Sequence, residues 1–377
     1  MRRRLLVSLG GAVAVAGVLS VTAVAQAQRQ SPPAGAGRTA PAPATSGRAA
    51  PAAKPAAGRT STAPRTPWGD PDLQGIWNFA TSTPLERPAA LGEKAVLSGN
   101  EAEQFEETLA YGLTRDRRDG GNEADVARAY NEHWMDPNRL KLLSDKRTSL
   151  VMDPPDGRIP PRVPPTPERQ KRAQEVAARA ARFNAGLPLS AQDFQPPVRG
   201  IIRTDMPPYL GTIYNNTAQI FQSPGYVVIE LEMIHSARII PMDGRPHLAS
   251  GLKQWLGDTR GRWDGSTLVL ETTNFRNDIG ALYGGANADT FKITERFTRV
   301  DPDTLTYEFT ISDPTTWSRP WTAMVPWGRI KQQLYEYSIH EENYDLVHLL
   351  AGARLREARG EKVPASTGRR PAGGDDR

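Results

Sequence analysis

Alternating apolar and polar residues between residues 211 and 340 predict a series of antiparallel strands. The alternation is clearest in residues 291–298 and 305–311, where every second side chain is apolar except for one acid. The sequence Asp301-Pro302-Asp303 between these segments is typical of a tight turn. The two segments therefore predict a hairpin with one apolar and one polar face, and residues 321–327 continue the same pattern.

Short turns between the strands indicate a meander. Asp243-Gly244 and Asp264-Gly265 mark two more tight turns, and a long meander removes its exposed edges by closing into a barrel or folding into a sandwich. Gly75-Ile76-Trp77 resembles the Gly-x-Trp opening of lipocalin-type barrels, although a buried tryptophan beside a turn gives the same tripeptide. The predicted fold class is mainly β: an antiparallel meander that closes into a lipocalin-like barrel or sandwich, with a helical N-terminal insertion.

Helical periodicity is confined mainly to residues 98–183. Ser98 and Glu101 form a capping box ahead of the first helix. Asn122 can cap a second helix, and residues 167–183 predict a third helix that is largely exposed to solvent. These helices precede most of the predicted strands, so we interpret them as an insertion into a β domain.

The N-terminus has the three parts of an export signal. Residues 2–4 are arginines, residues 5–24 are mostly apolar, and Ala25-Gln26-Ala27 is a cleavage site of the A-x-A type. We therefore predict a signal peptide over residues 1–27 and a periplasmic or secreted protein, which contacts a membrane only if the signal stays uncleaved. The arginine pair also permits the twin-arginine route, which exports folded proteins.

Composition divides the remaining chain into a linker, one domain and a tail. Residues 28–66 are rich in Pro, Ala and Gly and predict a disordered linker, residues 67–355 a single β-rich domain, and residues 356–377 a disordered tail. The first 66 residues hold nine Lys or Arg and no Asp or Glu, so a net charge of +5 becomes about −4 without them. This charge argues against nucleic-acid binding. The absence of cysteine excludes disulfides, thiolate metal sites and a cysteine nucleophile.

Several short motifs are spread along the predicted domain. It begins with PWGDPDLQGIW at Pro67 to Trp77, which fits the pattern PWGxPDLQGxW. The other motifs are Asp153-Pro154-Pro155-Asp156-Gly157-Arg158-Ile159-Pro160, Tyr214-Asn215-Asn216, residues 239–247, Trp255-Leu256-Gly257-Asp258 and His340-Glu341. Together they resemble the motifs of a family of secreted proteins from soil bacteria. The resemblance implies export and a lipocalin-like strand pattern, but it brings no activity with it.

His235 is the first candidate catalytic residue. It continues the apolar alternation of residues 227–233, so we expect it to point inward at the end of a strand, where ligand sites in barrels lie. The alternative is a histidine bonded to a backbone carbonyl at the edge of the core. His340, which precedes two glutamates, is a second candidate. With His247 and a carboxylate, these histidines could also form a zinc or copper site, although structural histidines are the default.

Glu295 is the third candidate catalytic residue. It is the one acid on an apolar strand face, and an unpaired buried carboxylate is costly. Glu295 therefore belongs to a site or is paired with an inward arginine. The arginines that qualify are Arg238, Arg296 and Arg319.

Four aromatic and amide residues predict a site for a small organic ligand, because they can stack on a ring and hydrogen-bond its hydroxyl groups. These are Tyr214, Asn215, Asn216 and Trp255. The alternative is that the aromatic residues fill a β core and that Asn215-Asn216 only turns the chain.

Several functions remain open at this point. The first is an exported lyase, isomerase or hydrolase that uses His235 as general base, with Glu295 or His340 as its partner, on a small polyhydroxylated or aromatic compound. The second is a lipocalin-like small-molecule binding protein without catalysis. A metal-dependent enzyme with a histidine cluster and a structural protein of the cell envelope are the others. No cofactor is predicted beyond the zinc or copper ion of the metal hypothesis.

Overall fold

The computed structural model describes residues 64–113, 135–276, 285–341 and 343–362. The predicted signal peptide, nearly all of the predicted linker, the second predicted helix and the end of the predicted tail lie outside these residues. The described part contains a sheet of ten strands. The strands are β1 (Gly75–Asn78), β2 (Val151–Asp153), β3 (Thr217–Ser223), β4 (Tyr226–Leu231), β5 (Ala237–Pro241), β6 (Asp258–Asp264), β7 (Thr267–Thr273), β8 (Lys292–Asp301), β9 (Thr304–Ser312) and β10 (Trp321–Ile330).

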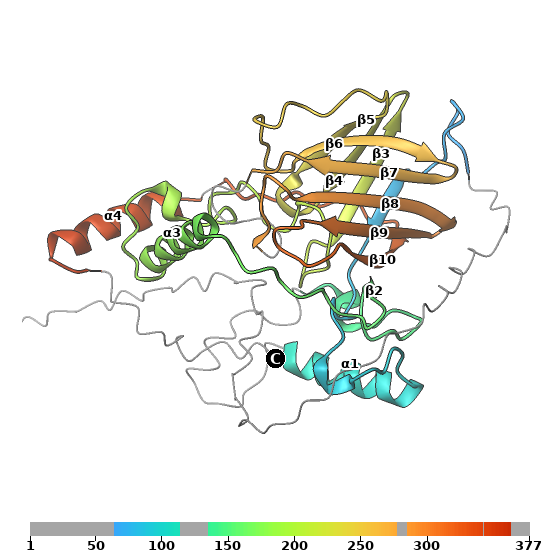
Figure 1. Cartoon of the computed structure of the whole chain (residues 1–377), viewed down its shortest axis with the longest axis horizontal. Coiled ribbons are helices and arrows are strands. Elements are labelled where there is room, and N and C mark those ends of the chain that lie inside the picture. Colours follow the sequence, from blue (N-terminus) through green and yellow to red (C-terminus); the bar gives the residue numbers. More distant parts are fainter. Residues whose placement is uncertain (1–63, 114–134, 277–284, 342, 363–377) are drawn as a thin grey trace, which may run out of the picture. The chain divides into compact units, whose positions relative to one another are not determined.

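The strands lie in the sheet nearly in chain order. The order is β5-β4-β3-β1-β10-β9-β8-β7-β6, with β2 paired to β10 beside this path. All pairs are antiparallel. The short strand β1 joins the run β3 to β5 to the run β6 to β10, because it pairs with both β3 and β10 (Figure 1). The predicted fold class, a mainly β antiparallel meander, is confirmed.

The apolar alternation places one face of each long strand in the core. β8 and β9 form the hairpin predicted from residues 291–311, and Lys292 of β8 pairs with Ser312 of β9. Ile293, Glu295 and Phe297 are fully buried, whereas Thr294 and Arg296 between them are half-buried. The same alternation buries Trp321, Ala323, Val325 and Trp327 of β10. Burial on one face only is therefore the physical reason for the pattern in the sequence.

Aromatic rings fill the interior of the sheet. The ring centroids of Phe297 and Tyr307 are 4.7 Å apart, and Trp327 lies 5.2 Å from Tyr307. Tyr209 lies 5.7 Å from Tyr307, and all four side chains are fully buried. Small barrels that bind a ligand keep it in this inner space. Here side chains occupy the space, so a ligand site must be sought elsewhere.

The two end strands of the sheet, β5 and β6, lie next to each other (Figure 1). No backbone ladder joins them in the described part of the chain, so the sheet is not closed into a barrel. Side chains bridge the gap instead. A Cβ added to Gly261 of β6 would lie 2.3 Å from Met242 Sδ and 3.0 Å from Ile240 Cγ2, which means that both pack on the bare backbone of Gly261. We call this junction of β5 and β6 the seam.

The described residues also form the helices α1 (Gly99–Leu113), α3 (Pro167–Asn184) and α4 (Asp345–Ala358). The predicted capping box of α1 is confirmed, since Ser98 N donates to Glu101 Oε2 at 2.9 Å and Glu101 N lies 3.4 Å from Ser98 Oγ. Helix α4 lies outside the helical region expected from the sequence, so that expectation was too narrow. Short 3-10 turns are η1 (Ala89–Leu91), η3 (Pro137–Leu140), η4 (Ala191–Asp193) and η5 (Met233–His235). Within the described ranges, no helix has the length and apolarity to cross a membrane.

Candidate functional site

Arg238 and Glu295 form a buried ion pair in the interior of the sheet. Arg238 Nη2 lies 2.6 Å from Glu295 Oε2, and Nη1 lies 3.1 Å from Oε1. Nη1 also donates to the Tyr209 hydroxyl at 2.8 Å, and the Tyr307 hydroxyl donates to Glu295 Oε1 at 3.0 Å. The structure shows the alternative given for Glu295, an inward arginine partner, and that partner is Arg238.

The charges in this cluster stabilise one another. Burial alone would lower the pKa of Arg238, but the Glu295 carboxylate outweighs this effect and the pKa is raised. Burial, and then the same carboxylate, raise the pKa of Tyr307, so its hydroxyl remains a donor. Glu295 accepts three hydrogen bonds from these two side chains. None of the contacts of the Glu295 carboxylate in the described residues is to a histidine.

A groove of about 650 Å³ runs along the seam. Its walls include Arg238 on β5, Arg260 on β6, and Arg245 and Trp255 in the loop between these strands. We call it the seam groove. Sites for small organic ligands commonly have volumes of about 300–1,000 Å³ and combine apolar walls with a few fixed polar groups.

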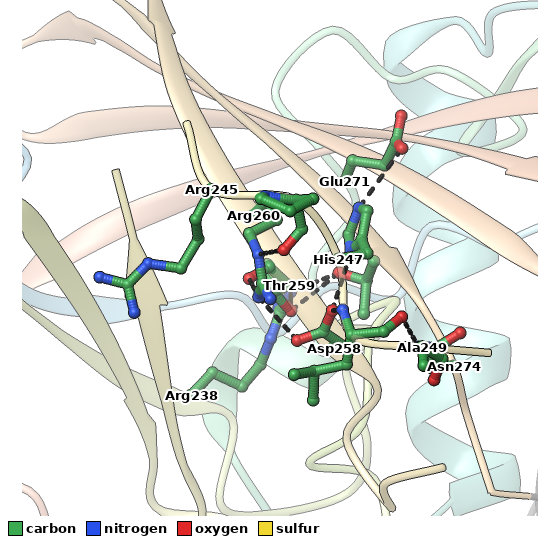
Figure 2. Close-up of polar contacts among 12 residues, drawn as sticks. Arg238, Arg245, His247, Ala249, Asp258, Thr259, Arg260, Glu271 and Asn274 are labelled. Carbon is green, nitrogen blue, oxygen red and sulfur yellow. Dashed lines mark hydrogen bonds and ion pairs between the residues drawn. The ribbon is translucent and has the colours of Figure 1, made fainter. Parts of the chain in front are cut away.

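His247 holds the loop of residues 242–257, which forms one wall of the seam groove. His247 Nδ1 lies 2.9 Å from Asp258 Oδ2, and Nε2 lies 3.4 Å from Glu271 Oε1 on β7 (Figure 2). The N–H of Leu248 donates to the same Asp258 oxygen at 2.9 Å. Both ring nitrogens of His247 therefore face carboxylates, which makes this histidine an anchor for the loop.

Asp258 belongs both to the groove wall and to this anchor. Burial raises the pKa of Asp258, but hydrogen bonds from the Leu248 N–H, His247 and Arg260 together outweigh burial and hold the pKa below its usual value. Arg260 Nη1 lies 2.6 Å from Asp258 Oδ1. Asp258 is therefore ionised at neutral pH and fixes the positions of Arg260 and His247.

The structure corrects the predicted placement of His235. Strand β4 ends at Leu231, and Ile234 and His235 have φ values of 61° and 46°. The chain then returns at once to β5, with Leu231 N bonded to Ser236 O at 2.9 Å. This turn, and not a continued strand, determines the direction of the side chain. His235 is exposed, so the prediction that it points inward is wrong.

His235 instead lines a second groove, of about 450 Å³, beside the end of β4. We call it the His235 groove. Other lining residues are Glu230, Glu232, Tyr335, Glu336 and Glu341. His235 Nδ1 lies 3.2 Å from the carbonyl oxygen of Tyr337. Because a carbonyl can only accept, Nδ1 carries the hydrogen and Nε2 has the lone pair in the neutral ring. The alternative of a histidine bonded to a backbone carbonyl is confirmed.

The three histidines of the predicted metal site are not brought together. His235 contacts Tyr337, and His247 contacts Asp258. The exposed His340 ring lies over Gly200, since a Cβ added to Gly200 would be 2.4 Å from Cε1 of His340. In the described residues no three His, Asp or Glu side chains are placed to hold a metal ion. Each histidine lies on its own segment with its own partner, which is why the predicted zinc or copper cluster does not form.

The four predicted ligand-binding residues have different surroundings. Trp255 lines the seam groove. The Arg203 guanidinium lies over the Tyr214 ring, with its Cζ atom 5.1 Å from the ring centroid of Tyr214. Asn215 has a φ of 54° and donates to Glu232 Oε1 at 2.6 Å, while the buried Asn216 donates to the carbonyl of Thr212 at 2.9 Å. Asn215-Asn216 therefore turns the chain, which was the alternative interpretation.

Sequence reasoning missed the arginines of the seam groove as site residues. Arg238 was considered only as a possible partner of Glu295, and Arg245 and Arg260 were not considered. The one available signal was the spacing of Arg238 and Ile240, which places both on the same strand face. The groove itself depends on contacts between β5 and β6 that no local pattern encodes.

Comparisons with known proteins assign no family. No protein-family model matches the chain, and no curated protein matches it significantly. A solved structure of a secretary abundant heat soluble (SAHS) protein from Ramazzottius varieornatus is similar over 30% of this chain and 70% of that chain, with 10% sequence identity and a TM-score of 0.21. A likeness at this level does not bear on function, so the site must be interpreted from its own residues.

Proposed function

We propose that this chain is an exported small-molecule binding protein that takes a partly aromatic organic ligand in the seam groove. The observation that carries the proposal is the position of the groove. It lies where the sheet is not closed by backbone hydrogen bonds, whereas aromatic rings fill the interior where a lipocalin-like barrel binds its ligand.

The walls of the seam groove suit a ring with polar substituents. Trp255 offers a large aromatic face, and the Arg276 guanidinium lies 4.7 Å from its ring centroid. Ile239 and Pro241 supply apolar surface from β5, and the Tyr226 hydroxyl provides a polar group. Stacking on tryptophan combined with a few fixed hydrogen bonds is a common way to bind small aromatic compounds.

Isothermal titration calorimetry with 2-naphthoate and 2-naphthamide tests this proposal. We expect at least one compound to bind the protein with one-to-one stoichiometry. Trp255→Ala should weaken binding about ten-fold, since it removes the stacking surface. Trp68→Ala is the matched control, because Trp68 is 38% exposed and is not part of the groove wall. No binding of either compound, or equal losses in the two variants, would contradict the proposal.

The second candidate is an acid–base enzyme centred on His235. The surroundings of the ring favour it, because the contact of Nδ1 with the Tyr337 carbonyl leaves the lone pair on Nε2 of the neutral ring, and His235 lines a groove with glutamates. On this hypothesis His235→Ala abolishes turnover of p-nitrophenyl acetate or p-nitrophenyl glycosides, whereas Trp255→Ala leaves turnover unchanged. The binding proposal instead expects Trp255→Ala to weaken ligand binding and His235→Ala to leave ligand affinity unchanged.

Export is part of the proposal and has its own test. The basic residues 2–4, the apolar segment 5–24 and the cleavage site at Ala25-Gln26-Ala27 support it. The mass of the protein recovered from the periplasm or the medium should correspond to a chain that begins at Gln28. A mass that includes residues 1–27 would contradict cleavage of the signal.

A further inference from the structure

Arg238 is buried, with 4% of its surface exposed, and it forms part of the wall of the seam groove. Its two Nη atoms are fully engaged by Glu295, Tyr209, Thr259 and Thr272. Its Nε has no hydrogen-bond partner in the described residues. The Nε–H of Arg238 is therefore a buried charged donor that a ligand oxygen could satisfy.

Arg245 offers a second guanidinium on the same groove. It is paired with Asp243, and both side chains are nearly half exposed. It also donates to the Tyr226 hydroxyl at 3.2 Å. An ion pair between exposed side chains contributes little to stability, so a ligand carboxylate can displace Asp243 from Arg245. The side-chain hydrogen bond from Arg245 lowers the pKa of Asp243 to about 2, so Asp243 competes as an anion at any neutral pH.

The charged side chains of the groove wall itself are mainly guanidinium groups, although Arg238 is paired with Glu295 behind the wall and Arg245 with Asp243 beside it. The charged lining residues are three arginines, Arg238, Arg245 and Arg260, and one aspartate, Asp258. Asp258 is committed to Arg260 and His247 at 2.6 and 2.9 Å. A guanidinium presents paired N–H groups that match the two oxygens of a carboxylate, which a neutral amide cannot reproduce.

We propose that the ligand of the seam groove carries a carboxylate, with its aromatic part against Trp255 and its anionic group between Arg245 and the Nε–H of Arg238. This inference rests on the proposed binding function and names the ligand class. Aromatic acids are thus preferred over the corresponding neutral amides. The preference depends on Arg245, and Asp243 acts as an internal competitor for the same guanidinium.

Calorimetric titration of 2-naphthoate and 2-naphthamide separates the two proposals. The acid should bind at least about ten-fold more tightly than the amide, and Arg245→Gln should remove most of this preference by weakening binding of the acid much more than binding of the amide. Asp243→Asn should strengthen binding of the acid, because it removes the competing carboxylate. Arg296→Gln is the matched control, since Arg296 forms a comparable exposed pair with Asp264 on β6 and is not part of the groove wall.

Arg238 is tested by Arg238→Lys, which keeps the positive charge but not the Nε–H at its position. Circular dichroism first establishes that the variant folds, and the variant should then lose more affinity for the acid than for the amide. If Arg238→Lys fails to fold, Arg245→Gln and Asp243→Asn still decide the proposal. Equal affinities for acid and amide in the unmodified protein overturn the carboxylate inference and leave the binding function intact. No binding of either compound overturns both.

Discussion

Arg238 on the end strand β5 and Glu295 on β8 are joined across the interior by two hydrogen bonds of 3.1 and 2.6 Å. These strands are not neighbours in the sheet. Arg238 Nη2 also donates to the hydroxyls of Thr259 on β6 and Thr272 on β7, at 3.1 and 3.0 Å. One side chain therefore connects both sides of the seam, and the groove beside it is held in shape by the same contacts.

Replacing only one residue of this ion pair should lower the free energy of unfolding more than replacing both. Glu295→Gln leaves the Arg238 charge buried without a counter-charge and is expected to lower the free energy of unfolding by about 3–5 kcal/mol. Replacing both residues by apolar side chains, Arg238→Met with Glu295→Leu, should cost less than Glu295→Gln alone, because no charge is left buried. Urea unfolding of the two variants measures the difference. If the double variant is less stable than Glu295→Gln, the cost of a buried unpaired charge does not explain the contribution of this pair to stability.

Gly257 should be far less replaceable than Gly265, although both have positive φ. A Cβ added at Gly257, where φ is +73°, would lie 2.8 Å from the backbone oxygen of Thr273 and 2.9 Å from the Phe275 ring. At Gly265, where φ is +60°, a Cβ would meet nothing within 4 Å. Gly265→Ala should therefore cost only the conformational penalty of about 1–2 kcal/mol.

Gly257→Ala adds an overpacking cost of about 1–3 kcal/mol to that penalty. Because Gly257 also lies in the wall of the seam groove, this variant should lose affinity for 2-naphthoate, whereas Gly265→Ala should keep it. Urea unfolding and calorimetry together give both quantities. Equal unfolding free energies for the two variants would argue against the crowding at Gly257.

Acid should weaken the contact between α3 and η4. Arg182 donates to Asp193 at 2.8 and 2.5 Å, and this pairing, against the opposing effect of burial, lowers the pKa of Asp193. A carboxyl with a lowered folded-state pKa contributes stability above its unfolded pKa, and this contribution is lost as the pH falls through the folded-state value. The stabilising effect of Asp193 is therefore complete at pH 7 and disappears below the ordinary value of 3.8.

Asp193→Asn should lower the free energy of unfolding by about 1.5–3 kcal/mol at pH 7. The difference from the unmodified protein should shrink as the pH is lowered towards 2, because the native carboxyl is then protonated too. Asp289→Asn serves as the control, since the Asp289 side chain is 74% exposed. A stability difference for Asp193→Asn that stays constant with pH is the result that this explanation does not allow.

His247→Ala should loosen the wall of the seam groove without unfolding the sheet. The variant loses the contacts with Asp258 and Glu271, but Leu248 N and Arg260 still bond to Asp258. We expect faster hydrogen exchange at Leu248 and weaker binding of 2-naphthoate, with only a small change in the free energy of unfolding. His348→Ala, on the exposed side of α4, should alter neither quantity. Unchanged exchange at Leu248 would mean that His247 does not anchor the loop.

Much of the fold could be predicted because its signals are local. The hairpin of β8 and β9 follows from burial of one strand face, and the start of α1 follows from the side chains of Ser98 and Glu101. The inward position of Glu295 and its need for an arginine followed from the same alternation and from the cost of a buried charge.

The rest could not be predicted, because it depends on where distant segments meet. Every second residue from 227 to 233 is apolar, yet the positive φ values at Ile234 and His235 turn the chain with no Gly, Pro or Asn to signal it. The filled interior and the open seam follow from the packing of Met242 and Ile240 on Gly261 and from the absence of a ladder between β5 and β6. A one-residue change in strand register would alter these contacts, and no local motif specifies that register.

Hydrogen–deuterium exchange of the protein with and without 2-naphthoate tests the central claim most directly, because it locates the ligand on the chain. We expect slower exchange in peptides that cover residues 237–241 of β5 and residues 254–260, which contain the walls of the seam groove. Protection confined to residues 230–235 and 334–341, around the His235 groove, would contradict the account, and so would an exchange pattern that the ligand leaves unchanged.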